Sequence, residues 1–112
     1  MKKFFAIPLE NGVLCSHFGH CTQFALVETD ENGVISERLV TPPPHEPGLL
    51  PAWLSSQGVT HVIAGGMGQH ALSLFAQNNI RVFLGAVAKE ARELVSDCLN
   101  EKLETGGNRC DH

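Results

Sequence analysis

The feature that most constrains the fold is a change in hydrophobic patterning at the proline-rich segment 41–48. Before this segment, short apolar stretches are separated by turn signals. After it, stretches typical of strands alternate with stretches at helical spacing. The segment itself is neither a helix nor a central strand, because proline lacks a backbone donor. The 112 residues suffice for one domain, so we expect a single α/β unit.

Three strands are predicted before the prolines. The continuous apolar run Phe4–Ile7 is typical of a strand buried on both faces. Two further strands follow over residues 23–29 and 34–40. The Asn32-Gly33 pair between them is a strong hairpin signal. These strands should form an antiparallel meander.

Helices and strands alternate after the prolines. Leu50, Trp53 and Leu54 fall at helical spacing, and Gly58 ends this predicted helix. The expected elements that follow are a strand over 59–64, a glycine turn over 65–68, a helix ending near Asn78, a strand over 80–84 and a helix over 87–99. The result is a mixed five-stranded sheet with an antiparallel meander and flanking helices.

The expected topology brings several loops together. A strand–helix–strand crossover makes its two strands parallel and is right-handed. If the first strand is parallel to both strands of that crossover, the loops after strands one, three, four and five emerge at one end of the sheet. Ligands of open α/β sheets bind at that carboxyl end. The sequence therefore predicts one site built from these loops.

Charge and hydropathy exclude some partners. The formal net charge is −4, which argues against a non-specific nucleic-acid binder. No apolar run approaches the length that spans a bilayer, about 20 residues. The apolar stretch after Lys3 is too short for a signal-peptide core, so we expect a cytoplasmic protein that binds neither nucleic acid nor membrane. In that compartment the four cysteines should be free thiols.

Candidate metal ligands gather in the loop after the first strand. His17, His20 and Cys21 lie within five positions, and Cys15 comes two residues earlier. Imidazole suits zinc, copper, iron or nickel, and thiolate suits copper and iron–sulfur clusters. The alternative is that the histidines cap a turn and Cys21 is a small core residue. His45, in the proline-rich loop, is either a further ligand or a surface histidine.

The segment Gly65-Gly66-Met67-Gly68 follows a predicted strand and precedes a helix. Its glycines allow close approach, and the helix start offers free N–H groups to an anion. Gly66-x-Gly68-x-x-Ala71 also fits a dinucleotide fingerprint weakly, because the next strand ends in glycine and alanine rather than an acid. Met67 and His70 either contact the ligand or pack.

Three other candidates differ in character. Cys98 lies in an apolar helical stripe and is expected in the core, and His61 is expected to be structural. Cys110 and His112 lie in a polar tail, where they either ligate a cluster or belong to a frayed terminus. We therefore expect a single cluster-binding domain over residues 1–104 and a flexible tail over 105–112. Since no nucleophile elbow or carboxylate pair is evident, no catalytic residue is assigned.

Several separated motifs together resemble the dinitrogenase iron–molybdenum cofactor biosynthesis family, the NifX/NifB-like cluster-binding proteins. They are Ser16-His17-Phe18-Gly19-His20-Cys21, His45-Glu46-Pro47-Gly48, Leu50-Pro51-x-Trp53-Leu54, Gly58-Val59-x-x-Val62-Ile63-x-Gly65-Gly66-Met67-Gly68 and Asn108-x-Cys110-Asp111-His112. The resemblance implies a three-layer ribonuclease H-like fold without ribonuclease H catalysis. It also implies binding or carriage of an iron–sulfur or molybdenum-containing cluster.

Three functions are consistent with the sequence. The first is a small carrier that takes a metal–sulfur cluster from a donor protein and passes it to an acceptor, without enzymatic activity. The second is a metal-dependent hydrolase of a nucleotide or phosphate that uses the Gly66–Gly68 turn. The third is an interaction module in which the cysteines and histidines are incidental.

Overall fold

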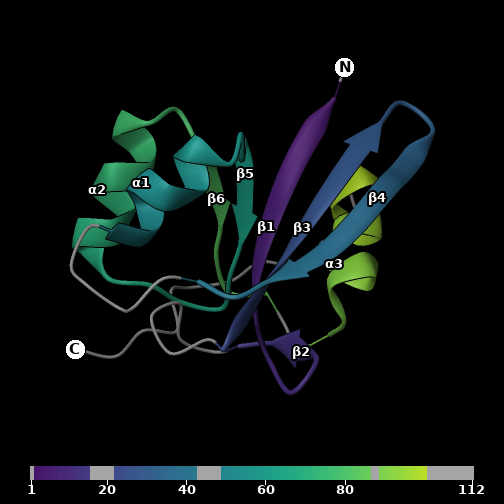
Figure 1. Ribbon diagram of the computed structural model, residues 1–112, viewed down its shortest axis with the longest axis horizontal. Coiled ribbons are helices and arrows are strands. Elements are labelled where there is room, and N and C mark those ends of the chain that lie inside the picture. Colours follow the sequence, from purple (N-terminus) through teal and green to yellow (C-terminus); the bar gives the residue numbers. More distant parts are fainter. Residues whose placement is uncertain (1, 16–21, 43–48, 87–88, 101–112) are drawn as a thin grey trace.

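A computed structural model of the protein describes residues 2–15, 22–42, 49–86 and 89–100 (Figure 1). Its elements, in chain order, are β1 (Lys3–Glu10), β2 (Val13–Leu14), β3 (Gln23–Asp30), β4 (Gly33–Val40), α1 (Leu49–Ser56), β5 (His61–Ile63), α2 (Gln69–Gln77), β6 (Arg81–Phe83) and α3 (Ala91–Leu99). None of the helices in these ranges is long and apolar enough to cross a membrane.

The strands form one mixed sheet in the order β4-β3-β1-β5-β6, and β2 pairs with β1. β3 is antiparallel to both β1 and β4, whereas β5 is parallel to both β1 and β6. The predicted α/β class, the antiparallel meander and the parallel crossover strands are therefore confirmed. β1 lies in the middle of the sheet, which explains its continuous apolar run.

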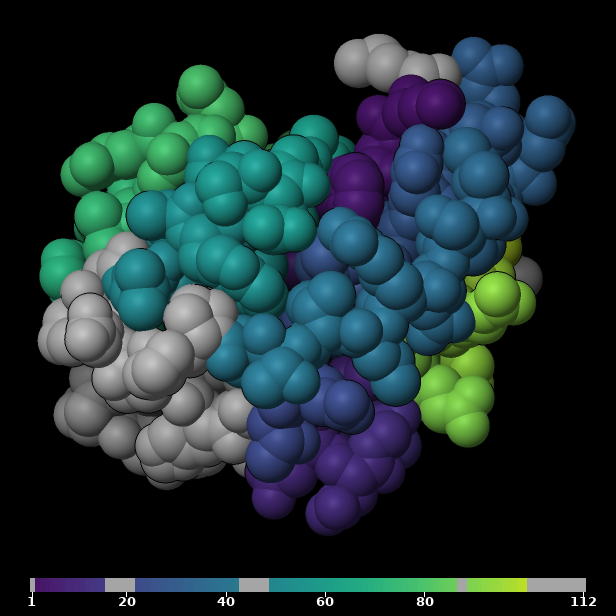
Figure 2. All heavy atoms as spheres, viewed as in Figure 1, coloured from purple at the N-terminus to yellow at the C-terminus, as the bar shows by residue number. Residues whose placement is uncertain are grey.

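Helices cover both faces of the sheet (Figure 1). Successive side chains of β1 point to opposite faces, so Phe5 packs with α3 residues such as Leu94, and Ala6 packs with Leu54 of α1 and Phe75 of α2. Each face has its own apolar cluster, and the fold thus has three layers. Figure 2 shows α1 and α2 on the left, the edge strand β4 in front and part of α3 on the right.

The predicted number of five strands is wrong, because β2 is a sixth. It pairs with the end of β1 through Leu9–Leu14 and Glu10–Val13, and Asn11-Gly12 forms the turn between them. A strand of two residues is too short to show the alternation by which strands are recognised in sequence. Asn11-Gly12 is itself a hairpin signal, and it carries the information that the hydrophobic pattern lacks.

Other boundaries also differ from the predictions. β5 and β6 are shorter than the strands predicted over 59–64 and 80–84. β1 continues through Pro8 to Glu10. The Pro8 carbonyl accepts a hydrogen bond from the Cys15 amide. On this side of β1, strand β5 pairs only with Phe5 and Ala6. No hydrogen bond between these strands therefore requires an N–H group at residue 8. α3 begins at Ala91, later than its apolar stripe indicates.

β1, β4, β5 and β6 all run in the same direction, since β4 is reversed twice relative to β1. Their last residues, Glu10, Val40, Ile63 and Phe83, therefore define one end of the sheet, which we call the carboxyl edge. It lies at the lower end of Figure 1. β1 is thus parallel to both strands of the crossover, β5 and β6, which is the condition for the predicted convergence of the loops.

Candidate functional site

The end of β1 holds both residues that flank segment 16–21. The backbone amide of Cys15 donates to the carbonyl oxygen of Pro8 over 2.9 Å, and the amide of Thr22 donates to that of Leu9 over 3.0 Å. The hydroxyl of Thr22 also contacts the Leu9 carbonyl, at 3.3 Å. Cys15 and Thr22, the two residues that flank segment 16–21, therefore both lie at the carboxyl edge.

The six predicted metal ligands all lie outside the described residues: His17, His20, Cys21, His45, Cys110 and His112. Their roles stay predictions. Within the described ranges, no group of three or more histidine, cysteine, aspartate or glutamate side chains is arranged to hold a metal ion.

Cys15 belongs to the core rather than to an open site. Its side chain is 4% exposed, and its Sγ donates to Oε2 of Glu10 over 3.6 Å. The neighbouring Leu14 amide donates to the carbonyl of Lys89, which ties β2 to the segment before α3. In the sequence, the apolar pair Val13-Leu14 directly before Cys15 is the signal that indicates a core position for this cysteine.

The glycine turn is connected to the end of β6. The amide of Gly85 donates to the carbonyl of Gly65 over 3.0 Å, and the amide of Ala86 donates to that of Ala64 over 3.3 Å. Gly85 has a φ of 75°, in the left-handed region that favours glycine. The acidic residue of a dinucleotide fingerprint is absent at this point. The positive φ of Gly85 explains why glycine stands here.

Gly68 is the N-cap of the nine-residue helix α2, with φ −72° and ψ 162°. Gly12, Gly33 and Gly58 have positive φ values, so their backbones favour glycine. Gly68 has an ordinary backbone conformation, and a Cβ added there meets nothing within 4 Å. Neither backbone nor packing among the described residues requires glycine at 68. This open position is the N-cap of a helix, where free N–H groups and the positive dipole end favour an anion.

The other candidates of this turn differ in exposure. Gly65 and Gly66 are buried, and the side chain of Met67 is 2% exposed in the cluster that contains Phe75. The Met67 side chain therefore packs in the core and does not reach a ligand. His70 is exposed in the first turn of α2. The turn can offer a ligand backbone amides and one imidazole.

His61 is structural, as expected, and lies at the opposite end of β5 from the glycine turn. Its ring centroid is 5.0 Å from that of Phe5, and its Nδ1 is 2.6 Å from Oγ1 of Thr60. Burial lowers the pKa of His61, and the positive charges of Lys3 and Arg81 lower it further.

Cys98 also behaves as a core residue. It is half-buried and packs against the apolar cluster on the α3 side of the sheet. Burial raises the pKa of the Cys98 thiol, and the charges of Lys3 and Arg81 oppose this rise. A neutral thiol there is a small hydrophobic group rather than a ligand.

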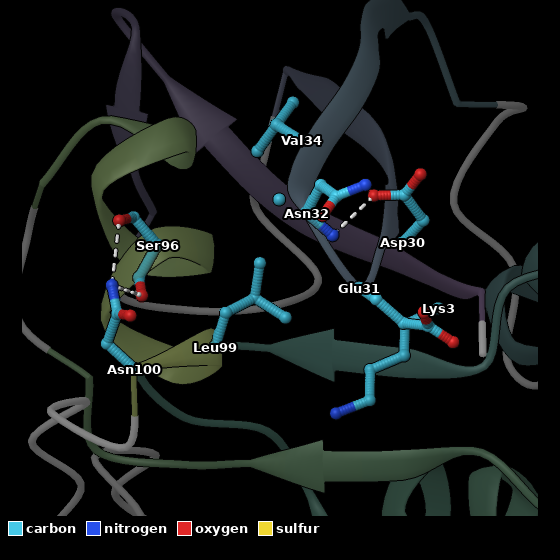
Figure 3. Close-up of a pocket in the computed structure, with 9 residues that line it drawn as sticks. Lys3, Asp30, Glu31, Asn32, Val34, Ser96, Leu99 and Asn100 are labelled. Carbon is cyan, nitrogen blue, oxygen red and sulfur yellow. Dashed lines mark hydrogen bonds between the residues drawn. The ribbon is translucent and has the colours of Figure 1, made fainter.

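A cavity of about 540 Å³ lies away from the carboxyl edge. Figure 3 shows it between Lys3 at the start of β1, the turn around Asn32, and Leu99 and Asn100 at the end of α3. These residues mark the end of the sheet opposite the carboxyl edge. The cavity is therefore no part of the predicted site.

Comparisons with known proteins agree with the motif pattern. The family model described as dinitrogenase iron-molybdenum cofactor matches residues 1–101. The uncharacterized protein MJ0580 of Methanocaldococcus jannaschii is 31% identical over 104 residues, which cover 88% of this chain and 84% of that protein.

Solved structures share the fold. The crystal structure of PH0822 superposes with a TM-score of 0.84 and 24% identity, over 98% of this chain and 100% of that one. The apo form of the orange protein from Desulfovibrio gigas gives a TM-score of 0.76 and 17% identity, over 95% and 94% of the two chains. At these identities the likeness concerns the fold alone.

Proposed function

Because the chain belongs to the dinitrogenase iron-molybdenum cofactor family, we propose that it binds a metal–sulfur cluster at the carboxyl edge and passes it on during cofactor assembly. The cluster, whether iron–sulfur or molybdenum-containing, is cargo rather than a resident group. Its donor and acceptor are other proteins. In this proposal the chain binds and releases the cluster, and it makes no covalent bond in a substrate.

The observation that carries the proposal is the meeting of two features at one edge. Cys15 and Thr22 are anchored to the end of β1, and the segment between them contains His17, His20 and Cys21. β5, which is parallel to β1, ends directly before the glycine turn. Soft ligands and a backbone suited to anions thus belong to neighbouring connections.

The chemistry of the turn fits an anionic cargo. Metal–sulfur clusters on thiolates are usually negatively charged, and hydrogen bonds to their sulfurs tune their reduction potentials. The open space at Gly68 lets such a group approach the first amides of α2. Thiolate from Cys21 and imidazole from His17 or His20 would supply the metal bonds.

The proposal extends to residues outside the described ranges. In it, His45, Cys110 and His112 are additional ligands, residues 1–104 are the binding domain, and residues 105–112 are a tail beyond that domain. The cytoplasm is the proposed location, and the ribonuclease H-like classification of the sheet stays a prediction.

The test is anaerobic reconstitution of the full chain with ferrous iron and sulfide, with and without molybdate or tetrathiomolybdate. We expect a coloured protein with stoichiometric metal after desalting. Cys21→Ser should lose most of the bound metal, whereas the matched variant Cys98→Ser should retain it. A colourless wild-type protein under all these conditions, or equal metal in both variants, contradicts the proposal.

A further inference from the structure

Two Asn–Gly pairs lie in tight turns of the sheet, and the fold holds them differently. Asn11 and Gly12, with φ values of 55° and 85°, form the whole turn between β1 and β2 and are both exposed. Gly12 lies outside the ladder, which ends at Glu10–Val13. Gly33, by contrast, is the first residue of β4 and pairs opposite Asp30.

The second turn is also held at its asparagine. The backbone amide of Asn32 donates to Oδ1 of Asp30 over 2.8 Å (Figure 3). The ladder behind it joins two strands of eight residues, whereas β2 has two. Local opening costs less free energy where fewer backbone pairs must break. The β1–β2 turn also protrudes at the lower end of the molecule in Figures 1 and 2.

From this difference we propose that Asn11 is a site of spontaneous deamidation, and that it reacts faster than Asn32 in the folded protein. The deprotonated backbone nitrogen of Gly12 attacks Cγ of Asn11. A bond forms between these two atoms, the bond from Cγ to the amide nitrogen breaks, and the leaving nitrogen takes a proton from water and departs as ammonia. Water then opens the five-membered succinimide, at Cγ to give aspartate or at the main-chain carbonyl to give isoaspartate.

Gly12 makes this attack sterically accessible. A Cβ at residue 12 would meet nothing within 4 Å, so the surroundings are open, and glycine itself adds no side chain beside the attacking nitrogen. The products add one negative charge beside Glu10. Isoaspartate also lengthens the backbone of a turn that has only two residues between paired positions.

Other asparagines in the described ranges are restrained. The carboxamide nitrogens of Asn78 and Asn100 donate to the carbonyls of Leu74 and Ser96, at 2.8 and 3.0 Å. Asn79 is followed by Ile80, whose backbone nitrogen donates to the carbonyl of Phe75 over 2.9 Å. In each case a group that the reaction needs is already engaged.

The experiment incubates the full chain at mildly acidic and mildly alkaline pH and follows both Asn–Gly peptides by mass spectrometry after digestion. In the folded protein we expect Asn11 to deamidate about tenfold faster than Asn32, which corresponds to about 1.4 kcal/mol. The rate should rise with pH, because the attacking nitrogen must lose its proton. In urea the two rates should converge, since both pairs are then unstructured.

Two variants sharpen the test. Asn11→Gln should abolish the mass change and the isoaspartate signal of that peptide, and Asn32→Gln should leave both unchanged. Equal rates for Asn11 and Asn32 in the folded protein overturn the proposal, as does an Asn11 that stays intact while the urea-unfolded chain reacts. None of these readouts depends on bound metal, so they are independent of the proposed function.

Discussion

The imidazole of His61 lies almost parallel to the ring of Phe83, with 7° between the planes and 6.2 Å between the centroids. Phe5 contacts the same imidazole, with 5.0 Å between the ring centroids. The side chain therefore combines an apolar environment with a titratable group. This arrangement makes the stability of the fold depend on pH.

We expect the free energy of unfolding to fall as the pH drops below about 6.5, the ordinary pKa of histidine. Burial, and then Lys3 and Arg81, lower the pKa of His61 in the folded state. The unfolded chain then binds a proton that the folded chain excludes, so acid favours unfolding, until the pH reaches the folded-state pKa. Urea denaturation at a series of pH values measures this slope.

The control for this prediction compares two histidines. His61→Phe should flatten the slope between pH 6.5 and the folded-state pKa of His61, because the titrating group is gone. His70→Gln, at an exposed position of α2, should keep it. An unchanged slope in His61→Phe would show that other groups cause the dependence.

Substitution of Gly68 should separate folding from binding. Gly68→Asn and Gly68→Asp should both raise the unfolding free energy by about a few tenths of a kcal/mol, since each can cap α2 and the Cβ has space. Asp adds a negative charge where the cargo is proposed to approach, so it should retain less iron and sulfide than Asn. Thermal denaturation and iron per chain are the two measurements. Equal metal in the two variants would remove Gly68 from the site.

Cys98→Ala should leave cluster binding intact and lower the unfolding free energy by about 1 kcal/mol or less, because a half-buried thiol is a small hydrophobic group. Leu94→Ala provides the comparison on the same helix. Leu94 is fully buried, and its truncation should cost about 2–5 kcal/mol. Metal lost from a folded Cys98→Ala protein would make Cys98 a ligand after all.

Deletion of residues 106–112 should leave the fold intact, because the polar tail has no periodic apolar residues. Cluster retention should fall if Cys110 and His112 are ligands. Circular dichroism tests the fold, and metal content after reconstitution tests the ligands. The double variant Cys110→Ala/His112→Ala should reproduce the loss. Full metal content in both proteins would return the tail to a terminus without a binding role.

Local signals predicted most elements correctly. The apolar run around Phe5 required a strand covered on both sides, and Asn32-Gly33 marked the β3–β4 turn. Gly58, with a φ of 85°, ended α1 where expected. The two-residue strand β2 was missed, because its pairing with β1 is a tertiary contact without a hydrophobic period of its own.

The candidate site also combines features that are evident in the sequence with features that depend on the fold. The amino-acid sequence identifies the residues that can supply soft ligands, His17, His20 and Cys21, and the glycine turn before a helix. The burial of the Met67 side chain in the core and the open space at Gly68 are evident only from the packing of the folded chain. Periodicity records which side of an element is apolar. Whether a side chain is buried depends on packing by segments distant in the chain.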